Sequence, residues 1–264
     1  MANVGLLYVG AVLFINGIML LGWLDAKSAA PMNFFVGGLQ VLTPTFIIFT
    51  ANGDENTILA ASGLYLFGFT YLYVGINLTA GLDGTGLGYF SLFVAVCAVV
   101  FSYLNFSSRL NDHAFGVIWL YWAFLWILFF LLLGLKMDGL GRYTGAVAAI
   151  QGWVTGAIPA FLLLTGNWGK HDNATAIALA IFGVIVFAAL YPVLGRPKPG
   201  PAEEPSQPDR SISPATGLST SRHYRSRRET CQRQFSRSTP ARNLPTRPSS
   251  VTTAGIQTSR RKSR

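Results

Sequence analysis

Residues 1–195 of this 264-residue chain hold very little charge: five basic and seven acidic residues, against 15 basic and four acidic residues from residue 196 onward. Only 12% of the whole chain is charged and 51% is hydrophobic, whereas soluble chains carry about twice that share of charge. The net charge of +9 therefore belongs to the carboxyl-terminal residues. It gives no reason to expect nucleic-acid binding by the apolar part of the chain.

The chain is also poor in the residues and motifs of catalysis. Its two cysteines are Cys97, in an apolar run, and Cys231, in the basic tail, so a disulfide framework is not expected. The sequence has no Cys/His metal spacing, nucleophile-elbow serine, P-loop or dinucleotide-binding glycine pattern. We therefore expect no enzyme activity, metal or cofactor. Met1–Gly22 lacks the basic segment and cleavage site of a signal peptide, so we expect it to remain as the first helix.

What the chain has instead is long apolar runs without charge. Seven of them are long enough to cross a bilayer: Val4–Gly22, Met32–Thr50, Thr57–Leu78, Leu87–Phe106, Ala114–Leu135, Thr144–Thr165 and Ala174–Leu194. Backbone polar groups have no partners in hydrocarbon, so each run is predicted to be a helix, antiparallel to the one before it. The sequence predicts an all-α, multi-pass integral membrane protein, with residues 1–195 as its transmembrane domain.

Residues 196–264 form a separate region rich in Arg, Ser and Pro. We expect this tail to be disordered and solvated, with no dedicated partner, although its basic clusters are also typical of headgroup or nucleic-acid contacts. A shifted reading frame is a further alternative. Because basic residues favour the cytoplasmic side, the tail predicts a cytoplasmic carboxyl-terminal region and an amino terminus outside the cell membrane.

Three tryptophans in the fifth run form the most distinctive pattern. Trp119, Trp122 and Trp126 have the spacing i, i+3, i+7 and share one helix face. The stripe is about 10 Å long at 1.5 Å per residue, so it extends beyond the interfacial depth where Trp is usual. We interpret it as the lining of a passage, the alternative being aromatic packing between helices.

An internal repeat relates the first, third and fifth runs. Leu7-Tyr8-Val9-Gly10 recurs as Leu72-Tyr73-Val74-Gly75, and Leu120–Ala123 is a weaker copy. We interpret this as three pseudo-threefold helical hairpins, each an odd-numbered helix with the helix after it, plus a seventh helix. The alignment makes three sets of positions equivalent: Leu6, Tyr71 and Trp119; Val9, Val74 and Trp122; Leu13, Leu78 and Trp126. These stripes are predicted to face one narrow, mostly apolar pore.

Several blocks of sequence carry a resemblance to a known family. They are Tyr8–Gly10, Met32–Leu39, Leu66–Tyr73, Gly81–Asp83, Ser91–Ala95 and the tryptophan stripe. Together, over about Val4 to Trp168, they resemble the AmiS/UreI family of urea channels and short-chain amide transporters. The resemblance implies one pore in each protomer of a homohexamer. Carried over by position, the residues implied at the pore constrictions are Leu6, Val9, Leu13, Phe67, Tyr71, Trp119, Trp122 and Trp126.

The chain departs from the urea channels of that family at two points. Gln151, which we include among the pore residues, stands where those channels have a glutamate in the sixth helix. The loops hold only His113 and His171, whereas acid-gated members carry several loop histidines. The seventh run also lies beyond the urea-channel pattern. These departures argue against acid gating and favour aliphatic amides over urea.

We therefore expect a passive inner-membrane channel for small neutral amides such as acetamide and urea. No charge lies inside any apolar run, whereas ion-coupled transport usually needs an intramembrane charge. An ion-coupled amide or urea transporter and a membrane sensor of amides are the alternatives. Asn16, Asn33 and Asn77 either bond neighbouring helices or contribute to the pore.

Overall fold

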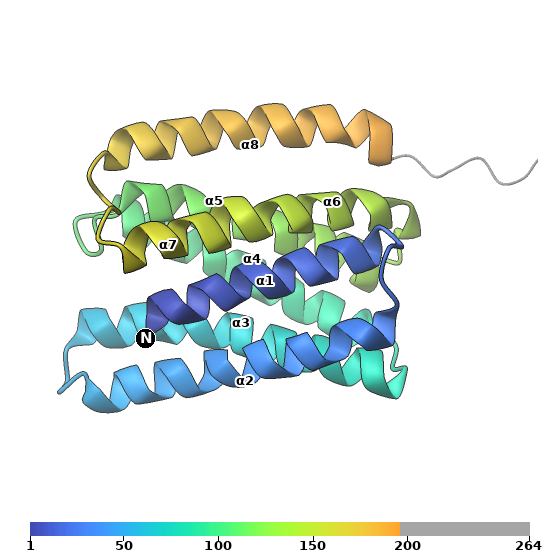
Figure 1. Cartoon of the computed structure of the whole chain (residues 1–264), viewed down its shortest axis with the longest axis horizontal. Coiled ribbons are helices and arrows are strands. Elements are labelled where there is room, and N and C mark those ends of the chain that lie inside the picture. The colour runs from blue at the N-terminus through green and yellow to red at the C-terminus, as the bar shows by residue number, and fades with distance from the viewer. Residues whose placement is uncertain (196–264) are drawn as a thin grey trace, which may run out of the picture. The chain divides into compact units, whose positions relative to one another are not determined.

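The computed structural model describes residues 1–195, and all regular structure within them is helical (Figure 1). The seven predicted spans are present as helices long and apolar enough to cross a membrane, which confirms the all-helical membrane class. The tail prediction for residues 196–264 lies outside the described residues. The helices are α1 (Ala2–Leu20), α2 (Ala26–Thr50), α3 (Glu55–Ala80), α4 (Thr85–Phe106), α5 (His113–Phe129), η1 (Phe130–Gly134), η2 (Asp138–Leu140), α6 (Gly141–Gln151), η3 (Gly152–Ala157), α7 (Ile158–Leu164) and α8 (Asp172–Leu194).

Aspartates in the short loops begin three of the helices. The side chains of Asp25, Asp54 and Asp112 accept hydrogen bonds from backbone N–H groups in the first turns of α2, α3 and α5. Such caps pair backbone donors that the helix itself leaves without partners. The cap at Asp25 lets α2 begin at Ala26, six residues before the predicted start of its apolar run.

The closest helix pairs are α2 with α3, α4 with α5, and α1 with the broken sixth span. Helices α3 and α5 thus pack most extensively against the helix before each of them, and α1 closes the ring against the sixth span. The repeat is present, but its tight pairs are shifted by one helix from the predicted hairpins. Glycines make the close approach possible. A Cβ on Gly10 of α1 would lie 2.5 Å from the Gly152 carbonyl oxygen, and Gly88 of α4 lies against Gly134.

The sixth span is not a continuous α-helix. Residues Gly152–Ala157 form a π-helical segment between α6 and α7, and Pro159 follows at the start of α7. Proline has no N–H to donate and so interrupts the α-helical hydrogen-bond ladder. The π segment is a bulge within an otherwise α-helical span; such bulges are rare and are frequent at functional sites.

Helix α8 lies along one edge of the bundle, beside α5 and α6, with α2 and α3 at the opposite edge (Figure 1). Only 11% of its apolar window is buried, so most of its surface is not covered by the rest of residues 1–195. Two tyrosine hydroxyls attach it: Tyr121 donates to the Leu179 carbonyl oxygen at 2.5 Å and Tyr143 to that of Phe187 at 3.0 Å. Helix α8 is therefore an addition to a bundle whose core is made by the first six spans.

Candidate functional site

Two cavities follow one another along the interior faces of α1, α3 and α5. The first, which we call the vestibule, has a volume of about 280 Å³ and reaches the end of the bundle at Asn3 and Asp112. Its wall combines apolar and aromatic side chains with four polar ones. The lining residues are Ala2, Asn3, Leu6, Val9, Gln40, Ala60, Leu64, Phe67, Phe101, Asn105, Leu110, Asp112, Phe115, Trp119 and Trp122.

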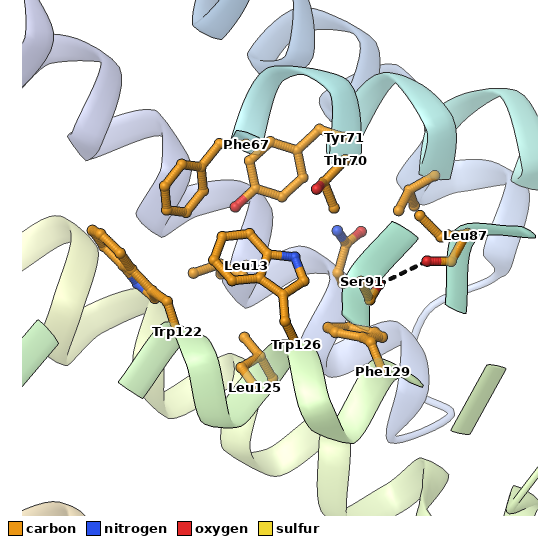
Figure 2. Close-up of a pocket in the computed structure, with 12 residues that line it drawn as sticks. Leu13, Phe67, Thr70, Tyr71, Leu87, Ser91, Trp122, Leu125, Trp126 and Phe129 are labelled. Atoms are coloured by element: carbon orange, nitrogen blue, oxygen red, sulfur yellow. Dashed lines mark hydrogen bonds between the residues drawn. The ribbon is translucent and has the colours of Figure 1, made fainter. Parts of the chain in front are cut away.

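The second, which we call the central cavity, lies deeper and is much smaller. Its volume of about 30 Å³ is room for about one water molecule. Figure 2 shows Phe67 and Tyr71 of α3 facing Trp122 and Trp126 of α5 across it, with the Tyr71 hydroxyl pointing toward Phe67 and Trp126. The full lining is Leu13, Asn16, Phe67, Thr70, Tyr71, Val74, Leu87, Ser91, Trp122, Leu125, Trp126 and Phe129.

Phe67 and Trp122 border both cavities and form the neck between them. Their ring centroids are 4.7 Å apart and the ring planes meet at 81°, an edge-to-face contact of the favourable kind. Trp126 also packs on Phe67, with a centroid separation of 4.9 Å, while Trp119 stacks on Phe101 at 4.6 Å. Aromatic contacts therefore separate the vestibule from the central cavity at the neck.

Hydrogen bonds from the broken sixth span fix one ring of the neck. The Trp122 indole N–H donates to Thr155 Oγ1 at 2.9 Å, and the Thr155 hydroxyl donates in turn to the Gln151 carbonyl oxygen at 2.7 Å. The Gln151 side chain donates to the Tyr121 carbonyl oxygen at 2.9 Å. All of these groups are buried. The Trp122 N–H is consequently occupied and does not face the passage, whereas Phe67 is held by ring contacts.

The central cavity carries hydroxyl and amide groups on an otherwise apolar wall. The hydroxyls of Thr70 and Ser91 donate to the carbonyl oxygens of Leu66 and Leu87, at 2.6 and 2.8 Å (the Ser91 bond is dashed in Figure 2). A hydroxyl that donates its proton still has oxygen lone pairs to offer. These groups can therefore accept hydrogen bonds from a solute with N–H donors.

Asn16, which also lines the central cavity, is bonded reciprocally to Asn33 of α2. Each Nδ2 donates to the other side chain's Oδ1, at 2.9 and 2.7 Å. Both residues therefore bond neighbouring helices, and Asn16 in addition lies at the wall of the central cavity. Asn77 makes no side-chain hydrogen bond among the described residues and lines neither cavity.

At the mouth of the vestibule, two aspartates hold the start of α5. Asp112 accepts hydrogen bonds from the Phe115 N–H at 2.9 Å and the Trp168 indole N–H at 2.8 Å. Burial raises the pKa of the Asp112 carboxyl above its usual value. Asp172 of α8 accepts from the backbone N–H groups of His113 and Ala114, at 3.0 and 2.8 Å, and pairs with His113 Nδ1 at 2.8 Å.

Eight of the nine predicted pore residues line the cavities. Leu6, Val9 and Trp119 border the vestibule, Leu13, Tyr71 and Trp126 border the central cavity, and Phe67 and Trp122 border both. Gln151 is fully buried but lines neither, because its side chain lies against the backbone of α5.

The repeat alignment misplaces α3 by seven residues, or about two helical turns. It sets Tyr71 level with Leu6 and Trp119, but Tyr71 lines the central cavity with Leu13 and Trp126. Phe67, one turn earlier, lies between the two levels. Gln40 on α2 lines the vestibule and was not predicted. A single glutamine in an apolar run carries no signal that separates a pore position from a helix contact.

Within residues 1–195, no group of three or more His, Cys, Asp or Glu side chains is placed to hold a metal ion. Neither neck residue is charged, and the charged lining residue of the two cavities, Asp112, lies at the mouth. The arrangement suits a small, uncharged, polar solute. Such a solute can exchange hydrogen bonds with hydroxyl and amide groups on either side of an aromatic constriction.

Comparison with known proteins gives matches to transporters and channels. The family described as AmiS/UreI family transporter matches residues 1–167. A Mycolicibacterium smegmatis protein named as an amidate substrates transporter is 53% identical over 193 residues, covering 73% of this chain and 90% of that protein. The acid-activated urea channel of Helicobacter pylori is 40% identical over 196 residues, covering 64% of this chain and all of that protein.

A solved structure supports the fold as well. The cryo-EM structure of the Helicobacter pylori urea channel in a closed state has a TM-score of 0.58 and 40% sequence identity to this chain. The match covers 64% of this chain and 100% of the chain in that structure. The 193-residue match to the mycobacterial protein extends past residue 167 and includes most of α8, whereas the family match ends before that helix begins.

Proposed function

The chain belongs to the AmiS/UreI family of transporters, and from this membership and its cavities we propose that it is a passive membrane channel for urea and short aliphatic amides. The observation that carries the proposal is the neck. Two cavities are lined in part by side chains that can form hydrogen bonds. The aromatic rings of Phe67 and Trp122, which carry no charge, separate one cavity from the other.

The physical basis is the cost of removing a solute from water. A neutral amide loses several kcal/mol when it is left without hydrogen-bond partners. Thr70 and Ser91 beyond the neck, and the polar residues of the vestibule before it, offset part of that cost. An ion would lose far more than these few groups can return, so the same passage excludes ions without a charged filter.

Passage requires the neck to open. Because Trp122 is fixed to Thr155, Phe67 is the ring that turns. It packs against Tyr71, Trp119, Trp122 and Trp126 through ring contacts with centroid separations of 4.7 to 6.3 Å. A turn of Phe67 would join the vestibule to the central cavity, while Trp122 keeps the width of the opening constant.

Among the substrates of the family we favour aliphatic amides over urea. Helix α8 lies within the alignment to the relative named as an amidate substrates transporter and beyond the family match. Its Asp172 holds the first turn of α5, the helix that carries the tryptophan stripe. Helix α8 thus fixes the first turn of α5 at the entrance of the vestibule, and through it the shape of the entrance that an amide meets.

The assembly and orientation complete the proposal. The resemblance to urea channels implies a homohexamer with one pore in each protomer. The basic residues of the carboxyl-terminal region favour a cytoplasmic location for it, which places the amino terminus and the vestibule outside. Native mass spectrometry of the purified protein measures the stoichiometry, and labelling of a cysteine introduced at Asn3 in intact cells measures the orientation.

Uptake into proteoliposomes distinguishes a channel from a coupled transporter. The purified protein is reconstituted, and uptake of radiolabelled acetamide and urea is followed with and without imposed proton and sodium gradients. We expect uptake down the amide gradient that is equal in all conditions and faster than uptake into empty liposomes. Uptake that occurs only with an ion gradient identifies coupled transport. Specific acetamide binding without any uptake identifies a sensor.

A further inference from the structure

Gln40 of α2 has hydrogen-bonding capacity that the fold does not use. Its side chain is 1% exposed, and its Oε1 makes no hydrogen bond to any of the described residues. A buried amide without partners costs free energy. Gln40 lines the vestibule together with Phe67 and Trp122, the two residues of the neck. An unpartnered polar group therefore lies beside the narrowest point of the passage.

Two other polar residues of the vestibule, Asn105 and Asp112, have hydrogen-bond partners within the protein. Asn105 Nδ2 donates to the Phe101 carbonyl oxygen at 2.8 Å. Both carboxylate oxygens of Asp112 accept hydrogen bonds, one from the Phe115 N–H and one from the Trp168 indole.

The space for the Gln40 amide depends on a glycine in the neighbouring helix. A Cβ on Gly5 of α1 would lie 2.9 Å from Gln40 Oε1. This is shorter than a carbon and an oxygen atom can approach without a hydrogen bond between them. A larger residue at this position would push the amide out of its place. Gly5 thus keeps the Gln40 amide beside α1 at the vestibule wall.

We propose that Gln40 is the substrate-binding residue of the vestibule and forms hydrogen bonds to the amide group of the solute before it enters the neck; this rests on the proposed function. A primary amide has a carbonyl acceptor and two N–H donors, and so does a glutamine side chain. The two groups are complementary in either orientation of the Gln40 amide. Gln40 accordingly selects solutes with N–H donors, while the neck selects by size.

A binding site in front of a barrier has a distinct kinetic effect. It sets the concentration at which flux saturates, whereas permeability at low concentration is set by the barrier itself. Loss of one net hydrogen bond weakens binding by about threefold to tenfold. Gln40→Met, which keeps the length of the side chain and removes its hydrogen-bonding groups, should raise the half-saturation concentration for acetamide by that factor and change low-concentration permeability less.

Three isomers provide a test that does not depend on any variant. Propionamide, N-methylacetamide and N,N-dimethylformamide have the same atoms but two, one and no N–H donors. As competitors of radiolabelled acetamide uptake in wild-type proteoliposomes, they should weaken in that order, and in Gln40→Met the differences should largely disappear. Asn77→Leu is the matched control, because Asn77 is another buried amide without partners but lines neither cavity; it should keep the wild-type order.

Each result decides the proposal. Equal competition by the three isomers in the wild type overturns it. So does a Gln40→Met variant whose half-saturation and isomer order match the wild type, or one that loses flux with no change in half-saturation, as a structural role would predict. Absence of any amide flux through the wild-type protein would instead defeat the proposed function itself.

Discussion

The hydrogen bond between Trp122 and Thr155 offers the sharpest perturbation of the neck. In Thr155→Val a methyl group replaces the hydroxyl, and the buried indole N–H loses the acceptor that lies 2.9 Å away. The Gln151 carbonyl oxygen loses its donor in the same change. Leaving such a buried group without a partner costs about 1–3 kcal/mol.

The substitution destabilises the observed orientation of the Trp122 ring, in which the ring narrows the passage. With about 1.4 kcal/mol corresponding to a factor of ten in population, other orientations of the ring gain roughly 5- to 140-fold relative to the observed one. We therefore expect Thr155→Val to lower the ratio of formamide to isobutyramide permeability several-fold, because a mobile Trp122 no longer holds the width constant. The thermal midpoint of the detergent-solubilised protein should fall as well.

Stopped-flow measurement of proteoliposome volume gives the permeabilities of the amide series directly. Thr155→Ser is the matched control, since it retains the hydroxyl acceptor and should keep the wild-type ratio. A Thr155→Val variant with wild-type selectivity and an unchanged thermal midpoint would refute the reasoning. Trp122 would then be held by its contacts with Phe67 and Trp119 alone.

Three further predictions concern the mouth, the tail and pH. Asp172→Ala removes the acceptor of two α5 N–H groups and should cost about 1–2 kcal/mol of stability, measured as a lower thermal midpoint in detergent, with Asp172→Asn intermediate; equal midpoints would contradict the capping role. Truncation after Gly195 should leave amide flux unchanged, because both cavities are built from residues before Trp168, and lost flux would assign the tail a part in transport. Flux should change little between about pH 5 and 7.5, the window of histidine titration. Burial raises the pKa of Asp112, so on acidification this carboxylate loses its negative charge at a higher pH than an exposed carboxylate does. A neutral solute interacts only weakly with that charge, so the flux should not follow it. A steep rise in flux on acidification would show that the mouth is gated.

The sequence predicted the spans and the convergence of the pore helices well. Long uncharged runs leave helices as the only stable structure in a bilayer, and the Trp119–Trp126 spacing identifies one helix face without tertiary information. The register of α3 was wrong by about two turns, because a four-residue match aligns segments along the chain but not their axial positions. Tyr71 consequently belongs to the central cavity and not to the level of Leu6.

The remaining features depend on contacts that no local pattern records. The π-helical segment of the sixth span brings Thr155 to the indole of Trp122, across 33 residues of sequence. The same break sets Gln151 against the Tyr121 backbone and away from the cavities. Gln40 occupies the vestibule because Gly5 of another helix leaves room for it. Each of these requires the packed bundle.

The central claim is that solutes pass between Phe67 and Trp122. It is tested most directly by the permeability of formamide, acetamide, propionamide and isobutyramide in proteoliposomes of the wild type and of Phe67→Ala. Removing the ring that closes the neck should raise the permeability of the larger amides relative to formamide, with a steep size dependence in the wild type and a shallow one in the variant. An identical size dependence in folded wild-type and Phe67→Ala protein would place the passage elsewhere and contradict the account.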